Sequence, residues 1–440
     1  MLALDDDLVL VRRVLGAERV DVVLHRGATP RAVTLPGGPA RALLAVGGAA
    51  IVASPDADDD AADGVALALP PRSALVLDRG PAADPDAAAL RRHNADLAGA
   101  AYRDGLIAIP SHPTRLILTV TEACNLRCAH CITGAPEATR SGRARTLAPW
   151  ALDALAETFA HVDHVAFTHG GETVTAPIFP EVLRRLARAR AGRPGRAEVH
   201  LASNGMLLDP ERLRRLVDLG LSSLMISIDG ATAATNDRIR VLGKLDRVLD
   251  HVRAAVALRD AGADLRIGLS SVLGRANLGE AAALARLAAD LGVDWLKLEE
   301  TYPATPFARR DLIAADAPEL RDAVAAAAAA LRGGRVVLVD HVDPPAACPC
   351  QATAADRDRA AAFRAADDFA HRARLAPCRA AWDQAFVDPD GTVRAIDHAG
   401  PVLGHLLDAP LLSLWNAAPA QALRARAIAA STPASRAACA

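Results

Sequence analysis

The sequence is poor in aromatic residues, has no long apolar run and carries almost no net charge. Phe, Trp and Tyr make up only 3% of the 440 residues. A net charge of −2 gives no reason to expect nucleic acid or an anionic membrane as partner. No stretch reaches about 18 uncharged apolar residues, so no membrane span is predicted. The start, Met1 to Arg13, carries Asp5, Asp6 and Asp7 where an export signal would be basic. We therefore expect a cytoplasmic chain.

A length of 440 residues exceeds what one compact core normally holds, which predicts two or three domains. Residues 1–110 contain short β-type runs separated by Gly, Pro and Asp clusters, and are read as a β-rich domain of unknown role. Residues 111–333 alternate between strand-like and helix-like segments. Residues 334–440 are irregular and are treated as a small C-terminal extension.

The central region predicts an α/β fold. Its strand-like runs are Leu116–Val120, Val165–Thr168, Val199–Ala202, Leu224–Ile228, Leu265–Leu269 and Trp295–Leu298. Amphipathic helical segments separate them, and parallel neighbours need such crossover helices. The pattern fits either an open doubly wound sheet or a partial barrel. In both, chemistry belongs at the carboxyl ends of the strands.

Cysteine is the residue whose distribution says most about function. Cys124, Cys128 and Cys131 form a C-x3-C-x2-C pattern directly after the first strand of this region. Disulfides are not expected in a chain without an export signal, so the group indicates a metal. Three thiolates can hold three irons of a cubane cluster and leave the fourth iron open. A structural zinc site would need a fourth ligand, for which His130 is the neighbouring candidate.

This pattern, at this position, resembles the radical SAM superfamily. The resemblance implies a partial (β/α)6 TIM-like barrel with a [4Fe-4S] cluster on the three cysteines. It also implies S-adenosylmethionine (SAM) chelated by the open iron and cleaved reductively. The 5′-deoxyadenosyl radical formed would abstract hydrogen from a substrate. An external electron donor such as flavodoxin or ferredoxin is implied as a partner.

Segments after the next strands extend the resemblance. It assigns cofactor contacts to Gly170, Gly171, Glu172, Ser203, Asn204, Ser227, Asp229 and Arg240. Glycine permits close backbone approach, so we expect a branched side chain at Gly171 to weaken SAM binding and to leave the cluster intact. Thr173 stands where the family usually has Pro. Alternatively, the Gly pair is only a turn, Ser227 and Asp229 only cap a helix, and Arg240 forms a surface ion pair.

The C-terminal extension is similar to the SPASM extension of peptide-modifying radical SAM enzymes. Cys378 and Gly391 are separated by twelve residues, as in that extension, but Ile396 stands where a further cysteine is expected. The ligands of an auxiliary cluster are therefore at least partly lost. Three interpretations remain open for Cys348, Cys350 and Cys378: ligands of a rebuilt second Fe-S cluster, a scaffold without iron, or thiol donors to the reaction.

The substrate is the least constrained part of the prediction. Glu299, Glu300 and Tyr302 follow the sixth strand and are candidates for substrate binding or proton handling, or else an acidic surface cluster. The extension and the added first domain favour a ribosomally made peptide as substrate. Residues 1–110 lack the three-helix pattern of a winged-helix leader binder, and this favours an alternative in which the substrate is a small molecule. That alternative is a dehydrogenase or epimerase acting on a sugar or aminocyclitol.

Overall fold

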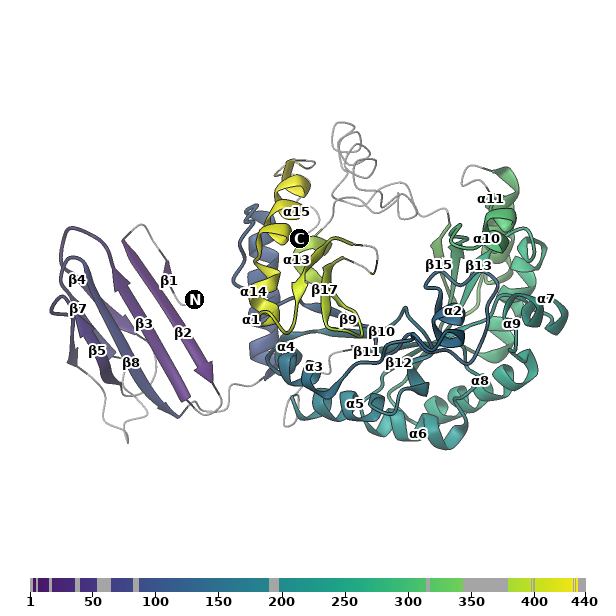
Figure 1. Ribbon diagram of the computed structural model, residues 1–440, viewed down its shortest axis with the longest axis horizontal. Coiled ribbons are helices and arrows are strands. Elements are labelled where there is room, and N and C mark those ends of the chain that lie inside the picture. Colours follow the sequence, from purple (N-terminus) through teal and green to yellow (C-terminus); the bar gives the residue numbers. More distant parts are fainter. Residues whose placement is uncertain are drawn as a thin grey trace. The chain divides into compact units, whose positions relative to one another are not determined.

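The computed structural model contains two compact units, Met1–Asp86 and Ala87–Ala440, both drawn in Figure 1. It describes residues 3–4, 7–15, 18–35, 40–53, 65–81, 87–189, 198–313, 317–342, 379–396, 398, 400–429, 431 and 433. The structure moves the predicted boundary from residue 110 to Asp86. Helix α1 (Ala87–Arg103) packs on α4 (Ala156–His161) and α13 (Ala380–Asp383), and therefore belongs to the second unit.

The first unit is built from two antiparallel sheets, as its β-rich sequence predicts. One sheet has the order β1 (Ala3–Leu4), β2 (Leu8–Leu15), β3 (Glu18–His25), β8 (Ser73–Pro81), β5 (Arg41–Val46). The other has the order β4 (Arg31–Leu35), β7 (Val65–Leu69), β6 (Ala50–Ala53). Alternate residues such as Val23, Leu67 and Leu75 are fully buried, which gives this unit a core of its own.

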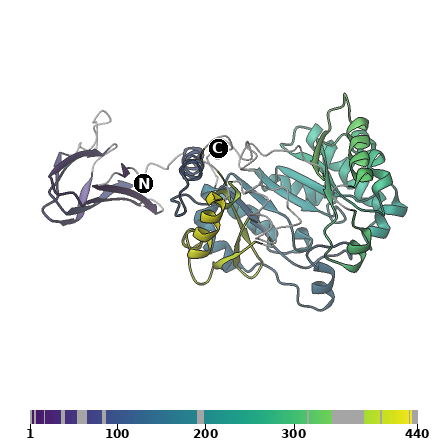
Figure 2. The same ribbon diagram turned by 90° about the horizontal axis from the view of Figure 1, so that it is seen from above.

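The second unit contains a ten-stranded sheet in which seven neighbouring strands, up to one edge of the sheet, run parallel. Those strands are β9 (Arg115–Leu118), β10 (His164–Phe167), β11 (Glu198–Ser203), β12 (Ser223–Ser227), β13 (Arg266–Leu273), β14 (Trp295–Glu300) and β15 (Val337–His341). The helices between them include α5 (Phe179–Arg188), α6 (Pro210–Asp218), α8 (Leu245–Asp260), α9 (Ala281–Leu291) and α11 (Pro318–Ala330). Figures 1 and 2 show these helices along one face of a curved sheet. The predicted partial TIM-like barrel is confirmed.

The two faces of this sheet differ in burial. Residues facing the helices, such as Leu201, Leu224 and Leu296, are almost completely buried. Residues one position along the strands, such as Met225 and Lys297, remain partly exposed on the inner face. Because side chains alternate along a strand, the apolar face packs the helices while the inner face stays available for chemistry.

The C-terminal extension continues the sheet instead of forming a separate body. Strand β16 (Gln384–Val387) pairs in parallel with β9, and β17 (Thr392–Ala395) and β18 (Val402–His405) follow in antiparallel order. β15, assigned from the sequence to the extension, pairs with β14 and ends the parallel sheet. Two helices, α14 (Leu411–Trp415) and α15 (Ala418–Ala429), follow these strands. Among the described helices, none has the length and apolar composition of a membrane span.

Candidate active site

Three cysteine thiols lie in the loop that follows β9. Cys124, Cys128 and Cys131 are partly buried and none forms a disulfide. Burial raises the pKa of Cys124 to about 12 and also raises the pKa of Cys128. Thiols in such surroundings stay protonated unless a cation binds them. Nη1 of Arg240 lies 4.0 Å from the Cys128 sulfur and adds positive charge. The loop is therefore suited to holding iron and not to presenting reactive free thiols.

The separation of the three sulfurs distinguishes a cluster from a single ion. Within the described residues, only His112, Glu157 and His161 bring three ligand atoms within 4.8 Å of one another, so at least two of the three sulfurs lie farther apart than that. Zn–S bonds of about 2.3 Å would hold tetrahedral sulfurs within about 4 Å of each other. His130, the candidate fourth zinc ligand, instead lies 3.3 Å from Asp229 (Nε2 to Oδ2). The donor set fits an iron–sulfur cluster better than zinc.

The His112 and His161 rings do not make a second metal centre. The rings stack with centroids 4.3 Å apart and planes 13° from parallel. Parallel imidazoles direct their nitrogen lone pairs side by side and not toward a common point. These two histidines are therefore read as packing at the amino end of the sheet.

The Gly-Gly-Glu segment after β10 lies directly against the cysteine loop. The Gly171 amide donates to the Thr121 carbonyl and the Glu172 amide donates to the Ala123 carbonyl, each at 2.8 Å. A Cβ on Gly171 would lie 1.9 Å from the Ala123 oxygen, so only glycine fits here. Ala123 precedes Cys124. The geometry therefore contradicts the expectation that a branched side chain at Gly171 would spare the cluster.

Glu172 joins this segment to the end of β11. Its carboxylate accepts hydrogen bonds from the Ser203 hydroxyl at 2.7 Å and the Asn204 amide at 2.8 Å. Burial raises the pKa of Glu172, while these two hydrogen bonds oppose that rise. The Asn204 side chain donates to the Asn125 side chain at 2.8 Å and lies 3.9 Å from the Cys124 sulfur. Predicted residues from two strand ends thus converge on the cysteine loop.

Asp229, after β12, forms a second connection to the loop. It is fully buried, accepts a hydrogen bond from the Val272 amide at 2.8 Å, and lies 2.6 Å from Nε of Arg240. Burial would raise the pKa of Asp229, but the charge of Arg240 holds it below its usual value. The N-cap of the next helix, α7 (Ala233–Ile239), is Thr232. Asp229 therefore holds Arg240 and His130 beside the cysteines instead of capping that helix.

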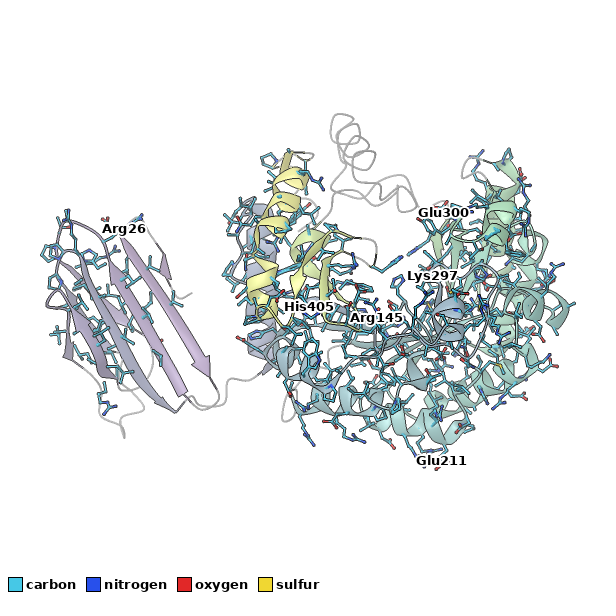
Figure 3. The ribbon with its side chains drawn as sticks, viewed as in Figure 1. Arg26, Arg145, Glu211, Lys297, Glu300 and His405 are labelled. Atoms are coloured by element: carbon cyan, nitrogen blue, oxygen red, sulfur yellow. The ribbon has the colours of Figure 1, made fainter. Side chains whose placement is uncertain are left out.

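The substrate candidates lie at the end of β14, at the same edge of the sheet. Strand register places Lys297 and Glu299 on the face that carries Ser227, and the two form an ion pair. Glu300 alternates to the other face, and Tyr302 is 37% exposed beyond the strand. Figure 3 labels two residues of β14, Lys297 and Glu300. Of the three substrate candidates, Glu299 is the one that lies on the same face of the sheet as Ser227.

Several residues of the site were missed by the sequence analysis. The Thr133 hydroxyl donates to the Gly170 carbonyl at 2.6 Å and lies 3.4 Å from the Cys131 sulfur. The Cys124 amide donates to the Thr139 hydroxyl at 2.9 Å. Only their closeness to the cysteines along the chain could have indicated them. The remaining predicted metal residues, Cys348, Cys350 and Cys378, lie outside the described residues.

Residues 118–288 match the Radical SAM superfamily, and the match covers the cysteine loop and the strand ends described above. Residues 118–288 form a radical SAM domain. The predicted family is confirmed, and with it the [4Fe-4S] cluster and SAM that radical SAM proteins use. The convergence of three thiols, a glycine-lined turn and buried polar groups at one sheet edge fits both cofactors.

Outside its radical SAM domain the chain is less closely matched. It is 31% identical over 188 residues to an AdoMet-dependent heme synthase of Methanosarcina barkeri, covering 42% of this chain and 50% of that protein. It is 28% identical over 180 residues to the mycofactocin maturase MftC of Mycobacterium tuberculosis, covering 41% and 43%. The chain thus spans half or less of these relatives. A PqqA peptide cyclase of Gluconobacter oxydans is 25% identical over 324 residues, covering 71% and 79%.

The fold is shared with a solved structure. SuiB of Streptococcus suis, bound to the precursor peptide SuiA, superposes with a TM-score of 0.52 at 14% identity. The superposition covers 75% of this chain and 70% of that chain. At this identity the likeness describes the fold and leaves the substrate open.

Proposed function

We propose that this chain is a radical SAM enzyme that cleaves SAM reductively in order to modify a ribosomally synthesised peptide. The observation that carries the reductive chemistry is the convergence of the three cysteines, Gly171 and Glu172 at the carboxyl edge of the parallel sheet. The enzyme class rests on the radical SAM domain. The peptide substrate is inferred from the relatives of the chain.

Each residue of the site has a positioning task. Cys124, Cys128 and Cys131 would hold three irons, and Arg240 would offset the thiolate charge. Glu172 keeps the ends of β10 and β11 together through its buried hydrogen bonds. When bound, the cluster and SAM supply a one-electron cleavage that generates a carbon radical. The buried residues beside the cysteines, such as Glu172 and Asp229, would limit the access of water to the site.

The extent of the alignments favours a peptide over a small molecule. The PqqA peptide cyclase aligns over 324 residues, well beyond residues 118–288. The heme synthase and a GTP 3′,8-cyclase of Geobacter sulfurreducens align over 42% and 43% of this chain. Both small-molecule relatives are aligned over fewer than 200 residues, as is the mycofactocin maturase. Among these four relatives, the PqqA peptide cyclase has the alignment that extends well beyond the length of the radical SAM domain.

The test compares wild type with a variant in which Cys124, Cys128 and Cys131 are all Ala. After anaerobic reconstitution and reduction by dithionite, we expect wild type to form 5′-deoxyadenosine and the variant to form none. Cys439→Ala serves as the matched control and should retain the activity. Product in the triple variant would refute the reductive chemistry. Incubation with a small peptide encoded beside the gene, followed by mass spectrometry, tests the peptide; no mass change would favour the small-molecule alternative.

A further inference from the structure

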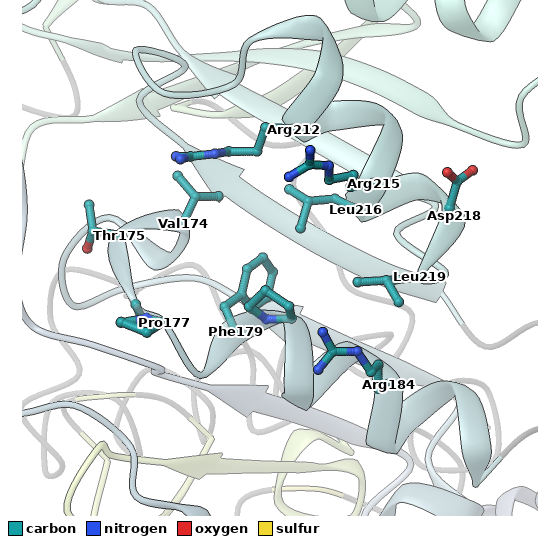
Figure 4. Close-up of a pocket in the computed structure, with 12 residues that line it drawn as sticks. Val174, Thr175, Pro177, Phe179, Arg184, Arg212, Arg215, Leu216, Asp218 and Leu219 are labelled. Atoms are coloured by element: carbon teal, nitrogen blue, oxygen red, sulfur yellow. The ribbon is translucent and has the colours of Figure 1, made fainter.

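A groove of about 640 Å³ lies between helices α5 and α6, away from the inner face of the sheet. Figure 4 shows Phe179 and Leu216 in its middle, with Arg184 on one side and Arg212 and Arg215 on the other. The groove therefore has an apolar floor and a rim on which these three arginines outnumber one carboxylate, that of Asp218. This combination suits a protein surface that carries acidic groups around an apolar centre.

The two helices that form the groove are basic although the whole chain is slightly acidic. They carry Arg184, Arg185, Arg188, Arg212, Arg214 and Arg215 against Glu181, Glu211 and Asp218. The side chains of Arg184 and Arg215 are 49% and 72% exposed even though each pairs with a glutamate of its own helix. The net charge of the chain is −2. The two helices together therefore carry three more positive than negative charges.

The wall of the groove connects directly to the cysteine loop. Val174 and Thr175, in the 3-10 turn η1 (Thr173–Thr175), line the groove. They follow Glu172, whose amide donates to the Ala123 carbonyl, one residue before Cys124. A protein seated in the groove would therefore contact the segment that touches the loop holding the cluster.

We propose that this groove docks the acidic one-electron carrier that reduces the cluster, a proposal that rests on the function proposed above. In this step a reduced flavodoxin loses one electron and the cluster gains it, with no proton or group transferred. Opposite charges would steer the encounter, and the apolar floor would fix its orientation. Electron-transfer complexes lie at the low end of protein-interface areas, so a single groove between two helices can provide such a contact.

The test compares two electron sources for the same reaction. Formation of 5′-deoxyadenosine is measured with reduced flavodoxin and with dithionite, in wild type and in the double variant Arg212→Glu, Arg215→Glu. Losing steering charge lowers the rate of association by about tenfold or more, so we expect at least that loss with flavodoxin. With dithionite we expect the rate to change by less than about twofold, because a small reductant needs no docking surface. Increasing salt should slow the flavodoxin reaction of wild type and have little effect on the variant.

Arg286→Glu is the matched control, since it reverses one exposed charge on α9, away from the groove. It should leave both rates unchanged. The milder double variant Arg212→Ala, Arg215→Ala should show a smaller selective loss, which guards against misfolding by charge reversal. A flavodoxin rate that is unchanged, or that falls only as much as the dithionite rate, would overturn the docking proposal. A wild type inactive with dithionite would contradict the proposed function instead.

Discussion

Single residues in the site hold other residues in place as much as they contact cofactors. The sequence predicts that Glu172 meets SAM, and the structure shows both of its oxygens accepting hydrogen bonds from Ser203 and Asn204. Asp229 is likewise occupied by Val272 and Arg240. Residue identities at strand ends could be read from the sequence. Their partners could not, because each partner comes from a different strand.

His200 provides a prediction at the residue scale. Burial lowers its pKa from 6.5 to about 4, and its ring lies 2.8 Å from the Ser223 hydroxyl. Below pH 6.5 His200 is protonated in the unfolded chain, whereas in the folded chain it stays neutral down to about pH 4. The free energy of unfolding should therefore fall as pH decreases through this window. At about 1.4 kcal/mol per pKa unit, the full loss is roughly 3 kcal/mol.

The measurement is urea denaturation of wild type and His200→Gln at about pH 7 and about pH 5. The variant should lose less stability on acidification than wild type, because its residue 200 cannot titrate. His341→Gln, at an exposed position, is the control and should behave as wild type. His164, whose pKa is also lowered to about 4 by burial, should leave part of the acid sensitivity in place. Equal pH dependence in His200→Gln and wild type would contradict the prediction.

At the scale of elements, the sequence predicts strands better than it predicts their neighbours. Periodicity located β9 to β14 because apolar positions repeat within each segment. It did not reveal that β16 pairs with β9, since the two strands are far apart in sequence and only tertiary contact joins them. β15 was misassigned to the extension for the same reason. Local pattern specifies an element, whereas pairing is decided by the whole fold.

Arg424, on α15, links the C-terminal extension to the segment that precedes β9. It is fully buried, and its guanidinium donates to the carbonyls of Ile107, Ala381 and Trp415 at 2.8 to 2.9 Å. It also lies 4.7 Å from the centre of the Trp415 ring. Burial lowers its pKa to about 10, so it remains charged at neutral pH. One side chain thus joins α13, α14 and the segment before β9.

We expect Arg424→Met to lower the free energy of unfolding by about 3 kcal/mol or more, because three buried carbonyls lose their donor. Denaturant unfolding of the whole chain measures this loss. Arg426→Met, two residues further along the same helix and exposed, is the matched control and should change stability by less than about 0.5 kcal/mol. A loss at position 424 no larger than the loss at 426 would show that the hydrogen bonds are dispensable.

At the scale of the whole molecule, the sequence separated a β-rich first unit from an α/β second unit but placed the division too late. Helix α1 belongs to the second unit because it packs on α4 and α13. Such packing leaves no mark in local composition. The cysteine loop is the opposite case. Its three ligands are close in sequence, so the metal site could be predicted without the fold.

The number of clusters in the whole molecule is the last prediction. Ile396 occupies the position where the resemblance to the SPASM extension predicts a cysteine, and its backbone has a φ of 70°, which is rare for a branched residue. Its amide donates to the Gln384 carbonyl, so the turn is held by backbone contacts without metal. Any second cluster would have to draw its ligands from Cys348, Cys350, Cys378 and Cys439. We expect at most one such cluster, and expect SAM cleavage not to require it.

Iron content and product formation together test this prediction. Changing Cys348, Cys350 and Cys378 to Ala should leave dithionite-driven formation of 5′-deoxyadenosine within about twofold of wild type and retain about four irons. Changing Cys124, Cys128 and Cys131 to Ala should abolish the product and leave either almost no iron or about four irons, according to whether an auxiliary cubane exists. About twelve irons in wild type would contradict the limit of one auxiliary cluster. Loss of product in the first variant would show that a second metal site is needed for SAM cleavage itself.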